Sequence, residues 1–298
     1  NMKQSFFKKI LIAVICSILL PISLYSQNND GEGIGLWTSI GAEKKIAKGF
    51  NADMEVEYRM RDNFDHTDRW TVGAGLSYRL YRNEDKTFSV KADLGYKYMN
   101  VWNAEERSDK DLYVHPDFED YTFQEYNIDE AYNITKHRAY VSLSASYELG
   151  RFKFGLRERY QMTYNDKKQI MEHKYRYTES ESAEEGETIV SGENDNIPGC
   201  VVRESEPEWK DAKTSNVFRS RFSIDYDIPN FKINPYCSVE LFNNLNKNFA
   251  LNKTRYIIGG EYTYKKVHSF KLYYQYQDQK SDDDPNSSVI GFNYKFEF

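Results

Sequence analysis

Charged residues recur at every second position in several segments of this chain, with apolar residues between them. If these segments form a closed sheet, the charged side chains meet inside it, where arginines and carboxylates can pair with one another. Such a set fills its enclosed space with ion pairs, or it lines a narrow conduit or a ligand pocket; the self-paired core is the commoner outcome. The expected inward charges are Asp53, Glu55, Glu57, Arg59, Arg69, Arg79, Lys91, Asp93, Arg138, Arg157, Arg159, Arg219, Arg221, Asp225, Glu240, Arg255 and Glu261.

No recognisable catalytic motif accompanies these charges. The five histidines lie in or beside the expected connections: His66, His115, His137, His173 and His268. A serine hydrolase needs a nucleophile and a base within hydrogen-bond reach, and the sequence has no G-x-S-x-G. His66 and His137 are the best candidates for a base at the rim of a lipid-modifying enzyme. C-x-x-C and H-E-x-x-H are also absent, so we expect no enzymatic activity, no metal and no cofactor.

The segment 50–61 illustrates the element that must position these side chains, because apolar and polar residues alternate strictly along it. A period of two is typical of a β-strand with one apolar and one polar face. Segments of this kind are expected at 35–44, 50–61, 69–80, 88–98, 138–149, 152–164, 215–227, 233–243, 254–266, 269–278 and 287–298. Strands in soluble sheets have roughly five to six residues, whereas a tilted strand that crosses a bilayer needs roughly nine to eleven. The lengths therefore favour membrane strands.

The connections between these segments alternate between short and longer ones. Outer-membrane barrels show this pattern, with short periplasmic turns and longer extracellular loops. We therefore expect an all-β fold, a single antiparallel transmembrane β-barrel of 10–12 strands with long acidic extracellular loops at 100–137 and 165–214. Because single-chain bacterial barrels have even strand numbers, the eleven segments imply ten or twelve strands, and the path of residues 28–44 stays open.

Glu158 breaks the alternation, because it falls on the outward side of its segment, between Leu156 and Tyr160. A charged residue that faces lipid is costly. A bulge or a shift in register within 152–164 would turn it toward the inside, and we expect such an irregularity there.

The N-terminus is basic and is followed by the apolar run 10–22. This composition predicts a secretory signal peptide over residues 1–26, which leaves 27–298 as the barrel. A membrane anchor is less favoured, because the run is shorter than the roughly 20 residues of a spanning helix and contains Pro21. We expect export to the outer membrane of a Gram-negative cell.

Aromatic residues alternate with polar ones at the C-terminus. They are Phe292, Tyr294, Phe296 and Phe298. We expect these side chains to face lipid in the closing strand, and the terminal aromatic to be the signal read by the outer-membrane insertion machinery. The expected partners are therefore outer-membrane lipid and that machinery. The formal net charge of -6 disfavours nucleic acid as a partner, and the oligomeric state stays open.

The order and spacing of several segments resemble a known family. These segments are GLWTSIGAEKKIAKGFNADMEVEYRMRDN, DRWTVGAGLSYRL, LGRFKFGLRERYQ, NPYCSVELFNNL, TRYIIGGEYTYKKVHSFKLYYQYQ and VIGFNYKFEF. Together they resemble the family filed as domain of unknown function 2490, over almost the whole chain that follows the signal peptide. The resemblance implies an outer-membrane β-barrel protein of Bacteroidota-type bacteria and supplies no site residues. The stretch 165–214 is longer than is usual in that family.

Three functions remain open from the sequence. A structural barrel that binds lipid or a partner is favoured, because no catalytic motif is present and the inward charges can satisfy one another. A narrow charged channel for small solutes is the first alternative, and a rim-located lipid-modifying enzyme is the second. The sequence does not name a ligand.

Overall fold

The computed structural model describes residues 33–114, 122–178, 188–190, 200–280 and 286–298. The expected signal peptide lies outside the described residues. Apart from one short 3-10 helix, η1 (Leu245–Lys247), the regular elements of the described residues are β-strands. Within these ranges, no helix is long and apolar enough to cross a membrane.

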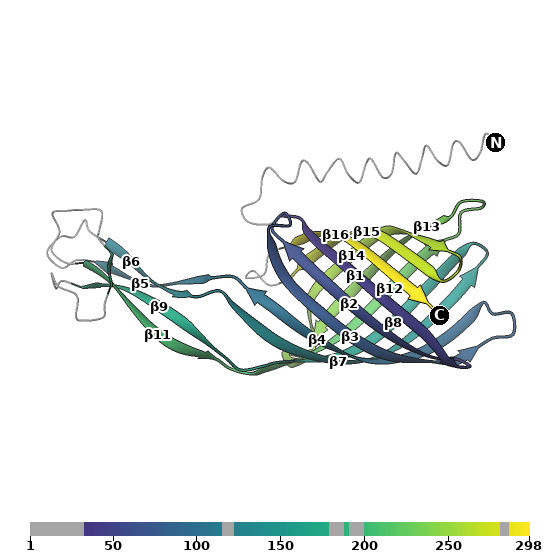
Figure 1. The fold of residues 1–298 in the computed structure, drawn as a ribbon, viewed down its shortest axis with the longest axis horizontal. Helices are drawn as coiled ribbons and strands as arrows, with labels where there is room; N and C mark the ends of the chain where they lie inside the picture. The colour runs from purple at the N-terminus through teal and green to yellow at the C-terminus, as the bar shows by residue number, and fades with distance from the viewer. Residues whose placement is uncertain (1–32, 115–121, 179–187, 191–199, 281–285) are drawn as a thin grey trace, which may run out of the picture.

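Among the described residues, eleven strands form a closed barrel in the order β1-β16-β15-β14-β13-β12-β8-β7-β4-β3-β2 (Figure 1). Their bounds are β1 Gly35–Ala47, β2 Phe50–Arg61, β3 His66–Arg82, β4 Phe88–Asn103, β7 Tyr132–Leu149, β8 Phe152–Asn165, β12 Lys213–Tyr226, β13 Ile233–Asn244, β14 Ala250–Tyr264, β15 His268–Gln279 and β16 Ser287–Glu297. Every segment expected from the alternation falls on one of these strands. The prediction of an all-β barrel is confirmed.

The barrel closes by a parallel pairing of β1 with β16, in which Gly35 lies opposite Val289 and Glu43 opposite Glu297. Phe298 continues this pairing, since its N–H donates to the Glu43 carbonyl at 2.9 Å. An odd number of strands joined by antiparallel steps makes the first and last strands run in the same direction. The number of strands lies within the expected range of ten to twelve, but the expectation of an even number is wrong, and the wall is not antiparallel throughout.

The two ends of the barrel differ. Five connections reverse the chain at one end, here called the turn end, and they join β1 to β2, β3 to β4, β7 to β8, β12 to β13 and β14 to β15. Gly49 (φ +80) and Gly150 (φ +62) adopt the left-handed conformation in two of these turns, which glycine does without a Cβ clash. The opposite end, here called the loop end, carries the other connections, including η1.

A second sheet, here called the projecting sheet, extends from the loop end away from the barrel (Figure 1). Its strands are β5 Glu106–Val114, β6 Thr122–Asp129, β9 Lys168–Thr178, β10 Thr188–Val190 and β11 Cys200–Lys210, in the order β10-β11-β9-β6-β5. The barrel neighbours β4, β7, β8 and β12 continue into β5, β6, β9 and β11, so the two sheets share one strand order. The segments 100–137 and 165–214, for which the sequence predicts loops, therefore contain five strands.

Aromatic and charged side chains make many of the cross-strand pairs of the projecting sheet, although β10 and β11 also pair aliphatic residues. Tyr126 and Tyr175 lie opposite each other on β6 and β9, with ring centroids 4.5 Å apart. The Arg107 guanidinium lies 3.8 Å from the centre of the Tyr126 ring. Cross-strand pairs of this kind stabilise a sheet without a thick apolar core. The contrast between apolar and polar positions is therefore weak here, which is why the sequence predicts loops.

Large apolar side chains face outward and remain exposed on every barrel strand. One from each strand, here called the apolar belt, is Ile40, Met54, Leu76, Leu94, Val141, Leu156, Phe222, Val239, Ile258, Leu272 and Phe292. Ile40 is 65% exposed and Met54 is 64% exposed, values that an apolar core would not allow. The alternate positions point into the barrel, so the wall separates an apolar outer surface from a polar lumen.

Candidate functional site

Glu240 of β13 is the acidic centre of the lumen and is 1% exposed. Its Oε1 accepts from Arg157 Nη2 at 2.6 Å, and its Oε2 accepts from Arg219 Nη2 at 2.9 Å. Arg255 Nη1 lies 3.6 Å from the same Oε2. These arginines project from β8, β12 and β14, on three strands around the wall. One carboxylate thus serves three guanidinium groups, and the group keeps a net positive charge.

Two aromatic rings hold the arginines in place. The guanidinium carbon of Arg59 lies 3.4 Å from the centre of the Trp37 ring, and that of Arg255 lies 5.0 Å from it. Arg219 and Arg255 lie 4.4 and 4.9 Å from the centre of the Phe242 ring. Arginine stacks well on aromatic faces because its guanidinium is planar and weakly hydrated. We define the arginine cluster as Arg59, Arg157, Arg219 and Arg255 with Glu240, Trp37 and Phe242.

Further inward bases surround the arginine cluster without a carboxylate of their own. Arg138 Nε donates to Thr163 Oγ1 at 3.0 Å, and Arg159 Nε donates to Ser142 Oγ at 2.8 Å. Among the described residues, the inward bases with no carboxylate within 4.0 Å are Lys136, Arg138, Arg159, Arg221 and Lys253. Lys136 and Lys253 precede the segments 138–149 and 254–266, so the sequence did not mark them as inward charges. Both strands begin earlier than the apolar alternation does.

The turn end of the lumen has a different composition. A cavity of about 260 Å³ opens there, with Glu43, Asp53, Glu55, Lys271 and Lys295 in its lining. Its lysines pair with acids. These pairs are Lys295 with Glu43 and Lys271 with Glu261 at 3.3 Å. Lys91, also at this end, pairs with Asp93 at 2.7 Å, and Lys97, near the middle of β4, pairs with Glu55 at 2.6 Å. Lysine charges at the turn end are therefore individually neutralised.

Some expected inward charges form ion pairs that do not include Glu240. Glu57 pairs with Arg59 on its own strand at 2.8 Å, and Arg69 pairs with its neighbour Asp68 at 3.0 Å. Arg79 is exposed close to the turn end of β3. The lumen set expected from the sequence is therefore divided between the two ends rather than joined in one network.

Glu158 faces outward, and the expectation that a bulge turns it inward is wrong. The pairings of β8 with β7 and with β12 run without a shift in register. The Glu158 carboxylate accepts from Ser220 Oγ at 2.6 Å, a partner on the adjacent strand with the same outward orientation. This hydrogen bond satisfies part of the polar group without a change of register.

The four C-terminal aromatics share the outward face of β16. Phe292 is 42% exposed and Phe298 is 57% exposed. The rings of Phe296 and Phe298 stack with centroids 5.2 Å apart. The Tyr294 hydroxyl and His268 Nδ1 form a hydrogen bond of 2.9 Å. The strand thus presents the aromatic surface that the sequence predicts for it.

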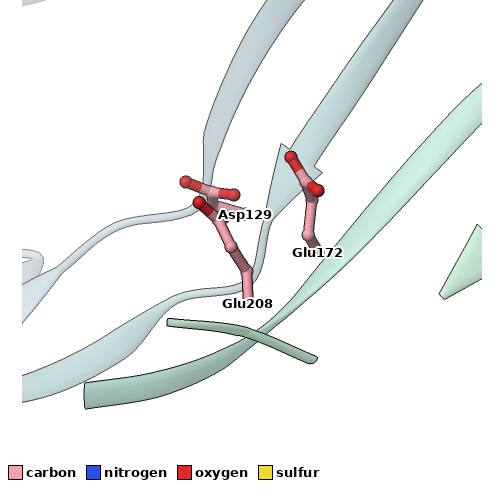
Figure 2. Close-up of side chains that lie close together, drawn as sticks. All are labelled: Asp129, Glu172 and Glu208. Carbon is pink, nitrogen blue, oxygen red and sulfur yellow. The ribbon is translucent and has the colours of Figure 1, made fainter. Parts of the chain in front are cut away.

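Three carboxylates meet where the projecting sheet joins the barrel: Asp129, Glu172 and Glu208 offer oxygens within 4.8 Å of one another (Figure 2). Lys210 Nζ lies 2.6 Å from Asp129 and 2.9 Å from Glu208. Burial lowers the pKa of Lys210, but its hydrogen bonds to Asp129 and Glu208 outweigh burial, so the pKa lies above its ordinary value. This lysine provides the positive charge that the carboxylates need.

His173, on β9, has a hydrogen-bond partner at each of its two ring nitrogens. Its Nδ1 lies 2.8 Å from Ser205 Oγ, and its Nε2 lies 2.8 Å from Glu130 Oε1. This connectivity is that of a hydrolase triad, and no sequence motif indicates it, because the three residues come from separate segments. Arg203 Nη2, however, lies 2.9 Å from both ring nitrogens and covers the imidazole. The arrangement is a structural cross-link of the projecting sheet.

The two histidines expected as rim bases have other neighbours. His66 Nδ1 lies 3.5 Å from Asp62, and His137 Nδ1 lies 2.5 Å from the Tyr96 hydroxyl. His137 Nε2 lies 3.6 Å from Asp166. Among the described residues, no serine hydroxyl forms a hydrogen bond with either ring.

Comparison with known proteins identifies one family. The sequence model of the family described as "Protein of unknown function (DUF2490)" matches residues 34–288. No curated protein matches the chain. Similar solved structures include the β domain of the Bordetella autotransporter BrkA, with a TM-score of 0.43 and 11% identity over 88% of this chain and 97% of that one. The translocator domain of NalP from Neisseria meningitidis follows, with a TM-score of 0.27 and 10% identity over 90% of each chain. Both TM-scores lie below the level at which two folds can be equated.

Proposed function

The chain belongs to the family described as Protein of unknown function (DUF2490), and we propose that it is an outer-membrane barrel that presents the projecting sheet to a binding partner. One observation carries this proposal. Four neighbouring barrel strands continue in unchanged order into the projecting sheet, so the barrel holds that sheet in a fixed position (Figure 1). We place the loop end at the cell surface and the turn end in the periplasm.

The apolar belt supports the membrane location. Contiguous apolar patches on soluble monomers rarely exceed a few hundred Å². Here exposed apolar side chains encircle the barrel, one or more on each strand. Tyrosines flank them, such as Tyr96, Tyr164 and Tyr264, each of them more than 40% exposed. Aromatic residues of this kind favour the two interfaces of a bilayer. The signal peptide expected at 1–26 and the aromatic C-terminus agree with export and insertion.

The lumen contacts argue against a wide pore. Arg157 on β8 reaches Glu240 on β13, and Lys97 on β4 reaches Glu55 on β2, so each pair skips a strand. Arg255 on β14 contacts the Trp37 ring on β1 across two intervening strands. Side chains that reach over neighbouring strands in this way narrow the lumen and brace the wall, as a structural anchor requires.

The projecting sheet has features of a binding surface. Strand β5 is an edge strand, and its outer backbone groups are free to pair with an added strand. Charged residues dominate β5, which discourages uncontrolled edge-to-edge pairing. Leu112 on this strand is 55% exposed. A protein or lipopolysaccharide partner could therefore contact backbone, aromatic and charged groups together.

Site-specific photo-crosslinking in intact cells tests the proposal. A benzophenone amino acid replaces Leu112 on β5 in one strain and the belt residue Leu272, 61% exposed, in the matched control. We expect position 112 to yield a discrete adduct with a protein or with lipopolysaccharide, and position 272 to yield adducts with membrane lipid. An inserted barrel with no adduct at 112, or a chain that fractionates outside the membrane, contradicts the proposal.

A narrow conduit for small solutes is the second candidate. The observation that favours it is the residual exposure of inward side chains, such as 23% for those of Arg69 and Arg157, which only lumen water can provide. Planar-bilayer recordings test it. A conductance that changes when Arg219 and Arg221 are replaced by glutamine supports passage, and silence supports the closed anchor.

A further inference from the structure

The loop-end half of the lumen holds more positive than negative charge. The inward bases of this half and of the adjoining middle of the lumen come from β2, β3, β7, β8, β12 and β14, and they are Arg59, Arg69, Lys136, Arg138, Arg157, Arg159, Arg219, Arg221, Lys253 and Arg255. Their carboxylate partners among the described residues are Glu57, Asp68 and Glu240. Bringing so many cations together away from bulk water is costly unless anions accompany them.

The bases converge on one region rather than being scattered along the wall. The Arg219 guanidinium carbon and Lys253 Nζ lie 4.4 and 5.0 Å from the centre of the same Phe242 ring, although they come from β12 and β14. Arg69 lies opposite Arg59 in the pairing of β3 with β2, and Arg69 and Arg219 both act electrostatically on Arg138. Arg69 also acts on Lys136. The centre of this group therefore lies within reach of several positive charges at once.

Hydrogen-bond donors in the same region have no partner. The Nε atoms of Arg157 and Arg219 are buried and make no hydrogen bond to any described residue. Thr71 Oγ1 and Ser238 Oγ, on the inward faces of β3 and β13, are also buried and make no hydrogen bond to any described residue. Buried donors of this kind are rare in proteins and call for a ligand or solvent.

We propose that the loop-end half of the lumen binds a small soluble oxyanion, a phosphate or a carboxylate, among Arg69, Arg138, Arg219 and Lys253. Guanidinium groups match the geometry of these anions through paired N–H donors. Trp37 and Phe242 fix the orientation of the neighbouring arginines before a ligand arrives, which lowers the entropic cost of binding. The barrel wall separates the site from lipid, so the ligand enters from water. The inference is independent of what the projecting sheet binds.

Calorimetric titration of the full barrel, folded in detergent micelles, tests this inference with inorganic phosphate and with succinate as probes. We expect saturable binding of one or both probes that weakens as sodium chloride rises. Arg138→Gln and Lys253→Gln each remove a base that has no carboxylate partner, and each is expected to weaken binding by roughly tenfold or more.

Lys271→Gln is the matched control, because Lys271 is an inward lysine of the turn end with its own partner, Glu261. Its affinity for the probes should equal that of the unmodified protein. Heat-modifiable migration on gels verifies that each variant is folded. If a variant does not fold, the thermal unfolding temperature of the unmodified barrel is measured instead, and we expect phosphate to raise it more than an equal ionic strength of chloride.

Two results overturn the inference. One is the absence of saturable binding of phosphate and succinate to the folded barrel, together with no specific rise in its unfolding temperature. The other is a loss of affinity in Lys271→Gln as large as that in Arg138→Gln.

Discussion

The two halves of the lumen differ in how far carboxylates balance their inward positive charges. At the turn end, the lysines Lys91, Lys271 and Lys295 each have an acidic partner. At the loop end, Glu240 is shared by three arginines, and other bases have no carboxylate within reach among the described residues. The same closed wall and the same alternation therefore produce one neutralised region and one cationic region. The difference lies in residue type and stoichiometry, not in backbone architecture.

The largest expected effect comes from Glu240→Gln, which leaves three guanidinium groups without their shared carboxylate. Removing one partner of a buried ion pair costs about 3–5 kcal/mol, because the remaining charges stay buried. Urea unfolding of the barrel in micelles measures the change. Glu261→Gln is the control, since Glu261 serves one lysine at a more exposed site and should cost about 1 kcal/mol or less. Equal losses in the two variants would remove the distinction between the halves.

The second prediction is that two lysine substitutions, one in each half of the lumen, differ in the sign of their effect on stability. Lys253→Met removes a cation that has no carboxylate partner from the loop-end half and should leave stability unchanged or raise it by about 1 kcal/mol in phosphate-free buffer. Lys295→Met removes the partner of Glu43 and should lower stability by about 1 kcal/mol. The same urea unfolding experiment compares them. A loss of stability in Lys253→Met as large as that in Lys295→Met would show that the loop-end charge is compensated.

The smallest expected effect lies in the projecting sheet, where Lys210 shares its charge between Asp129 and Glu208, the reverse of the situation at Glu240. Since the pKa of Lys210 is raised on folding, its contribution is complete below the pKa of an unfolded lysine, about 10.4, and is lost as pH rises toward the folded value. Limited proteolysis of the projecting sheet should therefore change little between about pH 8 and about pH 10, and become faster as the pH rises above about 10.4. We expect an effect under about 1 kcal/mol, and a Lys210→Met variant without this pH dependence. If the rate of proteolysis depends on pH in the same way in both proteins, Lys210 is not the source of that dependence.

Much of the barrel follows from the sequence, because a strand with one face toward the lumen and one toward an apolar medium has a period of two. The expected segment 50–61 coincides with β2, and the inward side of Arg157, Arg219, Glu240 and Arg255 follows from parity alone. The parallel closure does not follow, because it depends on which strand edges meet after the sheet curls. The expectation of an even strand number came from single-chain bacterial barrels, and this barrel of eleven strands differs from them.

The rest of the site depends on contacts that no local pattern encodes. Glu240 and Arg157 are paired through the register of β8, β12 and β13 and through the reach of both side chains over β12. The strands of the projecting sheet escaped detection, because charged and aromatic residues are mixed there with a few aliphatic ones and no long apolar alternation results. Glu158 stayed outward, because a hydrogen bond to Ser220 satisfied it without a bulge.

Anomalous diffraction from crystals of the barrel grown with selenate tests most directly the division of the lumen into a cationic and a neutralised half. Selenate is an oxyanion whose selenium can be located independently of the protein. We predict a selenium peak in the loop-end half, among Arg69, Arg138, Arg219 and Lys253, and none in the turn-end cavity lined by Glu43 and Lys295. A peak at the turn end, or a loop-end half without one, would contradict the account.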